Sequence, residues 1–417
     1  MRILHIAWEY PPLVYGGLGR HVGSLATAQA QAGHDVTVIT QSLSQEQDDV
    51  VDGVRVIRVP RDLPELALSE SQLLAWVAGL ESAFVRATTN LSHEWRPDLV
   101  HGHDWMIAHC VVTARELFDR PLVATIHATE AGRHQGWLPN DLSRAIHSVE
   151  WWLAQESARL IACSAHMRWE ISRLFSVPES RVTVVPNGID LDVWRTTPEA
   201  KSWARQKYAP DTPLLVFCGR LEWEKGLHTV LDAMPALRDH VPGIRLVIAG
   251  RGSQEDDMHR KVADLGLGDC VRFTGWLPED ELHALVATAD VAVVPSLYEP
   301  FGLVALEAAA LGTPVVVSRS GGLAEFAADG QVAATFSPGD PAGLSEAVVS
   351  VLQHPGLAER RAEIARRLLE DTYTWDRVAL ATERAYRTAI ADWDAGVVLE
   401  RAPGPIVPAG NLLTSGN

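Results

Sequence analysis

The chain has 417 residues, of which 47% are hydrophobic and 21% are charged, a balance typical of a globular protein with more than one hydrophobic core. The 36 Lys and Arg residues are outnumbered by 53 Asp and Glu residues, so the formal net charge is −17. This acidic balance argues against general nucleic-acid binding and against strong attraction to anionic membranes, although it is compatible with a locally basic site.

Targeting and cysteine signals are consistent with a cytoplasmic enzyme. No apolar run reaches the length of a transmembrane segment, and the N-terminal apolar run lacks a small-residue cleavage site, so it is predicted to be a first strand. The four cysteines show no metal-binding spacing and lie in or beside apolar runs, which favours buried thiols in a reducing compartment. They are Cys110, Cys163, Cys218 and Cys270.

The first half of the chain alternates short apolar runs with amphipathic segments, which predicts an α/β domain with a parallel sheet. The predicted strands are 2–7, 34–40, 54–59, 98–101, 122–126, 160–164 and 181–185, and the predicted helices are 20–32, 72–89 and 144–158.

A glycine-rich turn, residues 16–19, follows the first predicted strand. Val22 stands where the dinucleotide-binding fingerprint has its third glycine, and the turn lacks the Lys of a P-loop. Two interpretations stay open: a plain tight turn, or a close backbone approach to a phosphate or sugar.

Polar side chains also follow two later strands of this half. His103 and Asp104 come after one strand, and His127 comes after the next. Because ligands bind at the carboxyl ends of parallel strands, this pairing favours a binding site, although a single histidine is more often structural.

The second half continues with predicted strands at 214–218, 244–249, 271–273, 291–295 and 315–318. Arg220 and Lys225 follow the first of these, and two cations in one strand-to-helix loop can both face a diphosphate. The alternative is a solvated loop in which Glu222 and Glu224 are their partners.

Residues 291–322 form the most informative stretch: a buried strand, a loop with Glu299, a predicted helix over 301–311 and another strand. Glu307 is the only charged residue of that apolar helix, which is expected to be buried. Its carboxylate then needs a structural partner such as an arginine, or it reaches a polyhydroxy ligand. The N–H groups of Gly302 and Leu303, at the helix N-terminus, suit a phosphate.

The segment EPFGLVALE resembles the Glu-x7-Glu motif of the retaining glycosyltransferases of family four. Further matching segments follow in the same order as in that family, over about residues 2–393. The likeness is greatest to actinobacterial α-(1→4)-glucosyltransferases, the glycogen synthases of glycogen and methylglucose lipopolysaccharide synthesis. The matching segments are WEYPPLVYGGLGRHV, HGHDW, TIHATEAGRH, GRLEWEKG and LYEPFGLVALEAAALGTP.

The resemblance implies an α/β protein of GT-B fold, with two Rossmann-like domains facing an interdomain cleft. Residues 1–190 would form the acceptor domain and 206–374 the nucleotide-sugar domain, with a terminal helix at 375–396 crossing back to the first. The tail, 402–417, is rich in Pro, Gly and small polar residues and is predicted to be disordered.

The implied reaction is transfer of glucose from UDP-glucose or ADP-glucose to the non-reducing end of an α-(1→4)-glucan or a methylglucose lipopolysaccharide precursor, with retention of configuration. Neither a cofactor nor a metal is expected. The implied partners are the nucleotide sugar and a glucan or glycolipid acceptor; a homodimer stays open. The alternatives are a retaining hexosyltransferase or mannosyltransferase acting on a lipid or small molecule, a GT-B nucleotide-sugar epimerase, and a non-catalytic glucan-binding protein.

The family's functional positions transfer to this sequence as follows. Glu299 would contact the donor sugar, Glu307 would hold the ribose, and Arg220 and Lys225 would hold the diphosphate. The implied catalytic residues are His127, Glu299, Arg220 and Lys225. The implied donor-binding residues are Gly17, Arg220, Lys225, Arg251, Leu277, Glu299, Phe301, Gly302, Leu303 and Glu307.

The first domain would bind the acceptor, and ten of the 14 tryptophans precede residue 206. Trp105 and Trp137 flank the polar motifs and could stack on sugar rings, although packing in the core is the commoner use of tryptophan. The implied acceptor-binding residues are Glu9, Tyr15, Asp104, Trp105, Glu130 and Trp137.

Overall fold

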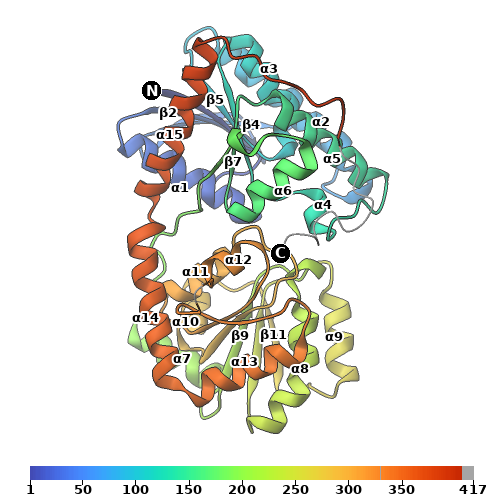
Figure 1. Cartoon of the computed structure of the whole chain (residues 1–417), viewed down its shortest axis with the longest axis vertical. Coiled ribbons are helices and arrows are strands. Elements are labelled where there is room, and N and C mark those ends of the chain that lie inside the picture. Colours follow the sequence, from blue (N-terminus) through green and yellow to red (C-terminus); the bar gives the residue numbers. More distant parts are fainter. Residues whose placement is uncertain (329, 406–417) are drawn as a thin grey trace. The chain divides into compact units, whose positions relative to one another are not determined.

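The computed structural model describes residues 1–328 and 330–405. The chain forms two compact units, each an α/β sheet with helices packed against it (Figure 1). Unit 1 comprises Met1–Gly188 together with the chain from Trp375 onward, and unit 2 comprises Ile189–Thr374.

Unit 1 contains an eight-stranded sheet in the order β3-β4-β2-β1-β5-β6-β7-β8. Its pairings are parallel except for β3, which runs antiparallel to β4 at the edge. Its strands are β1 (Arg2–Ile6), β2 (Asp35–Ser42), β3 (Gln47–Val51), β4 (Val54–Pro60), β5 (Leu99–His103), β6 (Leu122–Ile126), β7 (Arg159–Ala162) and β8 (Val182–Val184).

Two layers of helices pack on this sheet. Helices α1 and α15 contact each other and share one hydrophobic core with the strands, so they cover one face; α2, α3 and α5 form a second contacting layer (Figure 1). The helices of unit 1 are α1 (Gly17–Gln31), α2 (Leu73–Leu91), α3 (Ala108–Phe118), α4 (Glu130–Arg133), α5 (Asp141–Glu156), α6 (Ala165–Phe175) and α15 (Trp375–Asp394).

Unit 2 contains a six-stranded parallel sheet in the order β11-β10-β9-β12-β13-β14. Counted along the chain this is the order 3-2-1-4-5-6 of a dinucleotide-binding fold, whose direction of winding reverses between the first and fourth strands. The strands are β9 (Leu214–Cys218), β10 (Arg245–Ala249), β11 (Val271–Gly275), β12 (Val291–Val294), β13 (Val315–Ser318) and β14 (Ala334–Phe336).

The central strands of unit 2 are buried and rich in valine and leucine, as expected for a sheet covered on both faces. Helices α8, α9, α13 and α14 contribute to the larger core on one face. The helices of unit 2 are α7 (Pro198–Tyr208), α8 (Leu227–His240), α9 (Glu255–Asp264), α10 (Glu279–Thr288), α11 (Leu303–Ala310), α12 (Gly321–Phe326), α13 (Pro341–Gln353) and α14 (Pro355–Thr372).

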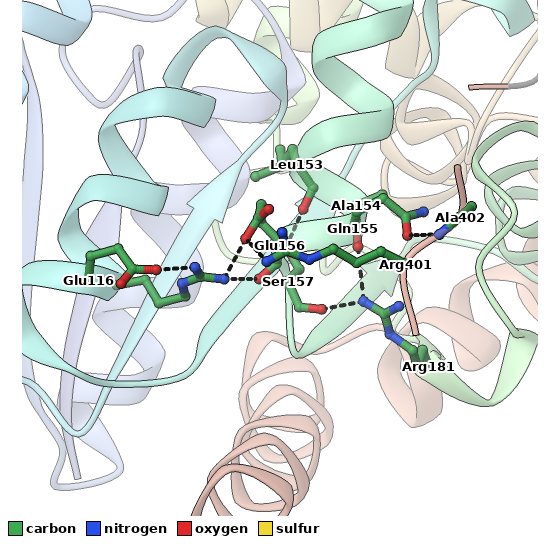
Figure 2. Close-up of polar contacts among 10 residues, drawn as sticks. Glu116, Leu153, Ala154, Gln155, Glu156, Ser157, Arg181, Arg401 and Ala402 are labelled. Atoms are coloured by element: carbon green, nitrogen blue, oxygen red, sulfur yellow. Dashed lines mark hydrogen bonds and ion pairs between the residues drawn. The ribbon is translucent and has the colours of Figure 1, made fainter. Parts of the chain in front are cut away.

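The segment that follows α15, also in unit 1, binds the end of α5 (Figure 2). Arg401 Nη2 lies 2.8 Å from Glu156 Oε2, and the N–H of Ala402 donates to Gln155 Oε1 at 3.0 Å. Glu156 also accepts from Arg115 Nη1 at 2.7 Å. Ala402, the predicted start of a disordered tail, is therefore held by a hydrogen bond, and residues 406–417 lie outside the described residues.

Most predicted elements are confirmed, and three match residue for residue: β6, β9 and β13. Strand β3 was not predicted, because its sequence, Gln47–Val51, is polar and largely exposed and it becomes a strand by pairing with β4. Helix α14 was not predicted either, although its buried residues recur at helical spacing. Among the described residues, no helix is long and apolar enough to cross a membrane.

The carboxyl ends of β9 and β10 pack so closely that glycine is required there. A Cβ atom at Gly250, where φ is +143°, would lie 1.9 Å from the carbonyl oxygen of Gly219.

We expect Gly250→Ala to lower the free energy of unfolding by about 2 kcal/mol or more, through backbone strain and overpacking. Chemical denaturation measures this change. The matched control is Gly268→Ala, where a Cβ atom has open space and a change within about 0.5 kcal/mol is expected; equal losses in the two variants would contradict the prediction.

Candidate functional site

In unit 2 the predicted donor-binding residues gather where the winding of the sheet reverses. Strands β9 and β12 are neighbours in the sheet although 72 residues separate their ends, Cys218 and Val291. At such a reversal the connections leave toward opposite faces of the sheet, which opens a crevice at the carboxyl ends of the strands. The loop after β9 carries Arg220 and Lys225, and the loop after β12 carries Glu299.

The two loops meet in an ion pair. Lys225 Nζ lies 2.8 Å from Glu299 Oε2, and the hydroxyl of Ser296 donates to the same oxygen at 3.0 Å. Both charged side chains are largely buried, with exposed fractions of 23% and 12%. Residues far apart in the sequence are thus brought to one point, as the family motifs imply.

The alternative partners proposed for the two cations are found only in part. Arg220 Nη2 contacts Glu224 Oε1 at 3.1 Å, as that alternative expected. Glu222 instead accepts from Ser253 Oγ at 2.5 Å, and Lys225 pairs with Glu299. Arg220 keeps 42% of its side chain exposed, so its guanidinium is accessible to an anionic ligand.

Backbone contacts fix these loops against each other. The N–H of Leu297 donates to the carbonyl of Glu224 at 2.8 Å, and the N–H of Gly322, in α12, donates to the carbonyl of Glu299 at 2.9 Å. A Cβ atom at Gly226, where φ is +71°, would lie 2.1 Å from the carbonyl oxygen of Pro295. Three loops therefore form one preorganised edge, which is the condition for electrostatic stabilisation of a reacting group.

Glu307 lies in α11, which begins after Gly302 in a left-handed conformation with φ of +105°. Its side chain is half-buried and borders a small cavity lined by residues that include Cys218 and Val304. Burial, and then the charge of Glu307, raise the pKa of the Cys218 thiol well above its ordinary value. The choice between a ribose contact and a structural role for Glu307 stays open.

The remaining predicted donor-binding residues of unit 2 lie along the same edge of the sheet. Arg251 follows β10 and is exposed, and its Nε would lie 3.1 Å from a Cβ atom at Gly275, which ends β11. Leu277 follows β11 and is half-buried. Phe301 is buried, and its ring centroid lies 5.8 Å from that of Tyr373.

In unit 1 the winding reverses between β1 and β5, and the predicted polar residues follow β5 and β6. Asp104 adopts φ of +61° and ψ of −177°, a conformation that costs a non-glycine residue of order 1–3 kcal/mol. Its Oδ1 accepts the N–H of His127 at 2.7 Å. Burial raises the pKa of Asp104 to about 6, against the opposing effect of this hydrogen bond. A strained residue with a perturbed pKa at a strand end marks a candidate functional site.

Glu9 lies beneath the glycine-rich turn. Its Oε2 accepts the N–H groups of Tyr15 at 2.6 Å and Gly16 at 3.1 Å, and burial raises the pKa of its carboxyl group. The Glu9 carboxylate is thus used to shape the turn that precedes Gly17, the first residue of α1. The contact of Glu9 with the acceptor stays a prediction. Tyr15, the other predicted acceptor-binding residue of this turn, is 46% exposed, and its ring stacks on that of Trp8 at a centroid distance of 5.1 Å.

The other predicted acceptor-binding residues differ in accessibility. Trp137 is 56% exposed, whereas Trp105 is half-buried. Glu130 Oε1 accepts from Ser143 Oγ at 2.7 Å and lies 3.2 Å from His134 Nε2. Trp137 therefore offers the most open aromatic surface of this set, and Glu130 is tied to the start of α5.

The sequence analysis missed a buried polar network beside His127. His5 on β1 and His101 and His103 on β5 are fully buried, with Gln29 of α1 and Tyr386 of α15 among them. The alternation His101-Gly102-His103 was a visible signal. Its meaning depends on the pairing of β5 with β1, which places His5 opposite His101.

Comparison with known proteins agrees with this geometry. Residues 15–193 match the family described as Glycosyltransferase Family 4, and residues 200–368 match the family described as Glycosyl transferases group 1. The chain is 44% identical to a glycogen synthase of Mycobacterium tuberculosis over 98% of both chains. It is 31% identical to a D-inositol 3-phosphate glycosyltransferase of Xylanimonas cellulosilytica, over 90% of this chain and 92% of the other.

Among solved structures, a sucrose-phosphate synthase from Thermosynechococcus elongatus aligns with a TM-score of 0.80 at 24% identity, over 94% of this chain and 99% of the other. The two sheets and the residues at their reversal points define a glycosyltransferase of GT-B fold. The chain belongs to the retaining family 4 glycosyltransferases, as its motifs predicted.

The raised pKa of Asp104 predicts how stability depends on pH. Because folding raises this pKa from 3.8 to about 6, the folded chain holds the proton more tightly, and deprotonation between pH 4 and 7 lowers the free energy of unfolding. At about 1.4 kcal/mol per pKa unit, the contribution is up to about 3 kcal/mol. Asp104→Asn keeps the acceptor for the His127 N–H, so we expect it to exceed the parent in stability at pH 7 and to match it near pH 4. Denaturant titrations at both pH values test this, and a constant difference between the two proteins would contradict it.

Proposed function

We propose that the protein transfers glucose from UDP-glucose or ADP-glucose, with retention of configuration, to the non-reducing end of an α-(1→4)-glucan or a methylglucose lipopolysaccharide precursor. The observation that carries this proposal is the 44% identity, over 98% of both chains, to a glycogen synthase. The convergence of Lys225 and Glu299 at the reversal point of unit 2 supports it.

The donor would lie along the edge built by β9, β12 and α11. Arg220 and Lys225 would neutralise the charge that develops on the leaving diphosphate, a role that cations in a partly dehydrated site perform without metal. Glu299 would hold the donor sugar, since its carboxylate is already oriented by Lys225 and Ser296. Glu307 would bind the ribose. Arg251, Leu277, Phe301, Gly302 and Leu303 would complete the nucleotide site.

Transfer with retention would proceed on one face of the sugar. The bond between the anomeric carbon and the diphosphate oxygen breaks, the acceptor hydroxyl adds to the same face, and its proton passes to a leaving phosphate oxygen. His127 would contact the donor sugar. The resemblance implies this course because it assigns no carboxylate as a covalent nucleophile.

The acceptor would bind to unit 1 through residues that include Asp104, Trp105 and Trp137. The exposed indole of Trp137 could stack on a sugar ring. Cys110 and Cys163 are buried, which supports the expectation of buried thiols in a reducing cytoplasm.

A second candidate is retaining transfer to a small phosphorylated polyol. The 31% identity to a D-inositol 3-phosphate glycosyltransferase over 90% of this chain favours it. This reaction would use the same donor site and differ only in the acceptor.

A direct assay separates these candidates. We expect incubation with UDP-glucose or ADP-glucose and maltoheptaose, in excess EDTA, to extend the oligosaccharide by successive hexose units, which mass spectrometry detects. Parallel reactions replace maltoheptaose with inositol 3-phosphate or omit the acceptor. Product only with inositol 3-phosphate would favour the second candidate, and strict dependence on added Mg²⁺ or Mn²⁺ would contradict the metal-free mechanism.

Substitution of the two glutamates of the motif should affect different steps, nucleotide binding for Glu307 and turnover for Glu299. A contact made equally in ground and transition states affects KM, whereas a contact that strengthens in the transition state affects kcat. We expect Glu307→Gln to weaken binding of free UDP or ADP, and Glu299→Gln to bind nucleotide nearly as well as the parent but turn over at least about 10²-fold more slowly. Calorimetric titration and initial rates measure both.

The control is Glu222→Gln, in the adjoining loop, whose carboxylate bonds Ser253; it should behave as the parent. The reverse pattern in the two glutamate variants would exchange their roles. Loss of folding in Glu307→Gln alone would indicate that this residue is structural.

A further inference from the structure

Five histidines of unit 1 lie close together, and the reaction proposed above uses only His127. They are His5 on β1, His21 on α1, His101 and His103 on β5, and His127 after β6. Side chains at alternate positions of a strand point to one face. His5, His101, His103 and Thr125 share the face covered by α1 and α15, which contribute Gln29 and Tyr386. These groups are buried away from water, so each polar atom needs a partner.

Six hydrogen bonds join these groups into one unbranched sequence, here called the histidine chain. It links Thr125 Oγ1 to His101 Nε2 (2.8 Å), His101 Nδ1 to Tyr386 Oη (2.6 Å), Tyr386 Oη to Gln29 Nε2 (3.1 Å), Gln29 Oε1 to His5 Nε2 (2.7 Å), His5 Nδ1 to His103 Nε2 (3.1 Å), and His103 Nδ1 to His127 Nε2 (3.4 Å).

The amide of Gln29 assigns the direction of every bond in the histidine chain. An amide nitrogen only donates and an amide oxygen only accepts. Gln29 Nε2 donates to the Tyr386 hydroxyl, which must then donate to His101 Nδ1. Gln29 Oε1 accepts from His5, so the proton of His5 is on Nε2 and its Nδ1 is an acceptor.

The same reasoning applies to the remaining imidazole rings, those of His103 and His127. Each neutral imidazole has one N–H and one acceptor nitrogen. His103 therefore donates from Nε2 to His5, and His127 donates from Nε2 to Nδ1 of His103. Burial lowers the pKa of His5 and of His127 to about 4 and that of His103 well below its ordinary value, so these rings are neutral at pH 7.

We propose that Gln29 and Tyr386 are positioning residues that hold His127 as its Nε2–H tautomer, which leaves Nδ1 as a hydrogen-bond acceptor for a sugar hydroxyl. The proposal rests on the role of His127 in the proposed function. Reversing the Gln29 amide would reverse every bond from His5 to His127 and place the proton on Nδ1, where it would meet a hydroxyl as a donor. In the observed order the Tyr386 hydroxyl accepts from Gln29 Nε2 and donates to His101 Nδ1, and through these bonds the C-terminal helix α15 is linked to a strand-end residue of unit 1.

A metal ion is the rival interpretation, because nitrogens of His5, His101 and His103, and those of His21, His103 and His127, lie within 4.8 Å of one another. A metal would require the protons between His5, His103 and His127 to leave. In the first group, both ring nitrogens of His101 and Nε2 of His5 already have partners that belong to neither group. The contacts therefore fit a proton-ordered chain.

The test combines a spectroscopic readout with kinetics. In protein labelled with ¹⁵N-histidine, long-range ¹⁵N–¹H correlation spectra assign the tautomer of each ring. We expect Nε2–H at His5, His101, His103 and His127 in the parent at pH 7. Tyr386→Phe keeps the ring but frees the Gln29 amide to turn, so we expect a mixture of tautomers at His127 and a fall in kcat of roughly tenfold, with nucleotide affinity unchanged.

Thr88→Val is the matched control. It also removes one buried hydroxyl of unit 1, but this hydroxyl donates to the carbonyl of Phe84 within α2 and lies outside the histidine chain, so His127 should keep its Nε2–H form and kcat should stay within about twofold of the parent. Nδ1–H at His127 in the parent, or binding of one Zn²⁺ per chain that His103→Ala abolishes, would overturn the proposal. An unchanged His127 tautomer in Tyr386→Phe would do so as well. The parent spectrum decides the proton order even if a variant does not fold or the substrate assay shows no glucosyl transfer.

Discussion

The reversal of strand order in each sheet is the constraint on which both candidate sites depend. In unit 2 it brings the loops after β9 and β12 together, and in unit 1 it places β1 beside β5. Parallel strands need long connections, so residues that meet at such a reversal are necessarily distant in sequence. Lys225 and Glu299 meet in this way, as do His5 and His103.

The two units accommodate polar side chains at the buried carboxyl ends of their strands in different ways. Unit 2 keeps charges, and the Lys225–Glu299 pair remains partly exposed, which limits the cost of taking both charges out of water. Unit 1 keeps its histidines neutral and joins them by hydrogen bonds, because burial penalises the imidazolium form. The charged pair would suit a diphosphate, and the neutral histidines would suit hydroxyl groups.

Much of the fold could be predicted, as could the gathering of Lys225 and Glu299 at one edge of the unit 2 sheet, because the signals for both are local. Buried parallel strands are short apolar runs, so β9 and β13 were located residue for residue. Features that depend on contacts between distant segments or on loop geometry were not predicted. The polar strand β3 depends on its neighbour β4, the use of Glu9 to shape the turn at Tyr15 depends on loop geometry, and the strained conformation of Asp104 has no signature in the sequence.

By itself the sequence determined the family and the α/β class and indicated the candidate residues for a nucleotide-sugar site, because motif spacing and strand patterns are properties of short segments. The tertiary structure decided which carboxylate pairs with which cation: Glu224 takes Arg220 and Glu299 takes Lys225. It also decided that Tyr386, 259 residues beyond His127, shares one hydrogen-bond chain with it. Such contacts are set by strand order and by the packing of α15 on the sheet, which no short segment of the chain encodes.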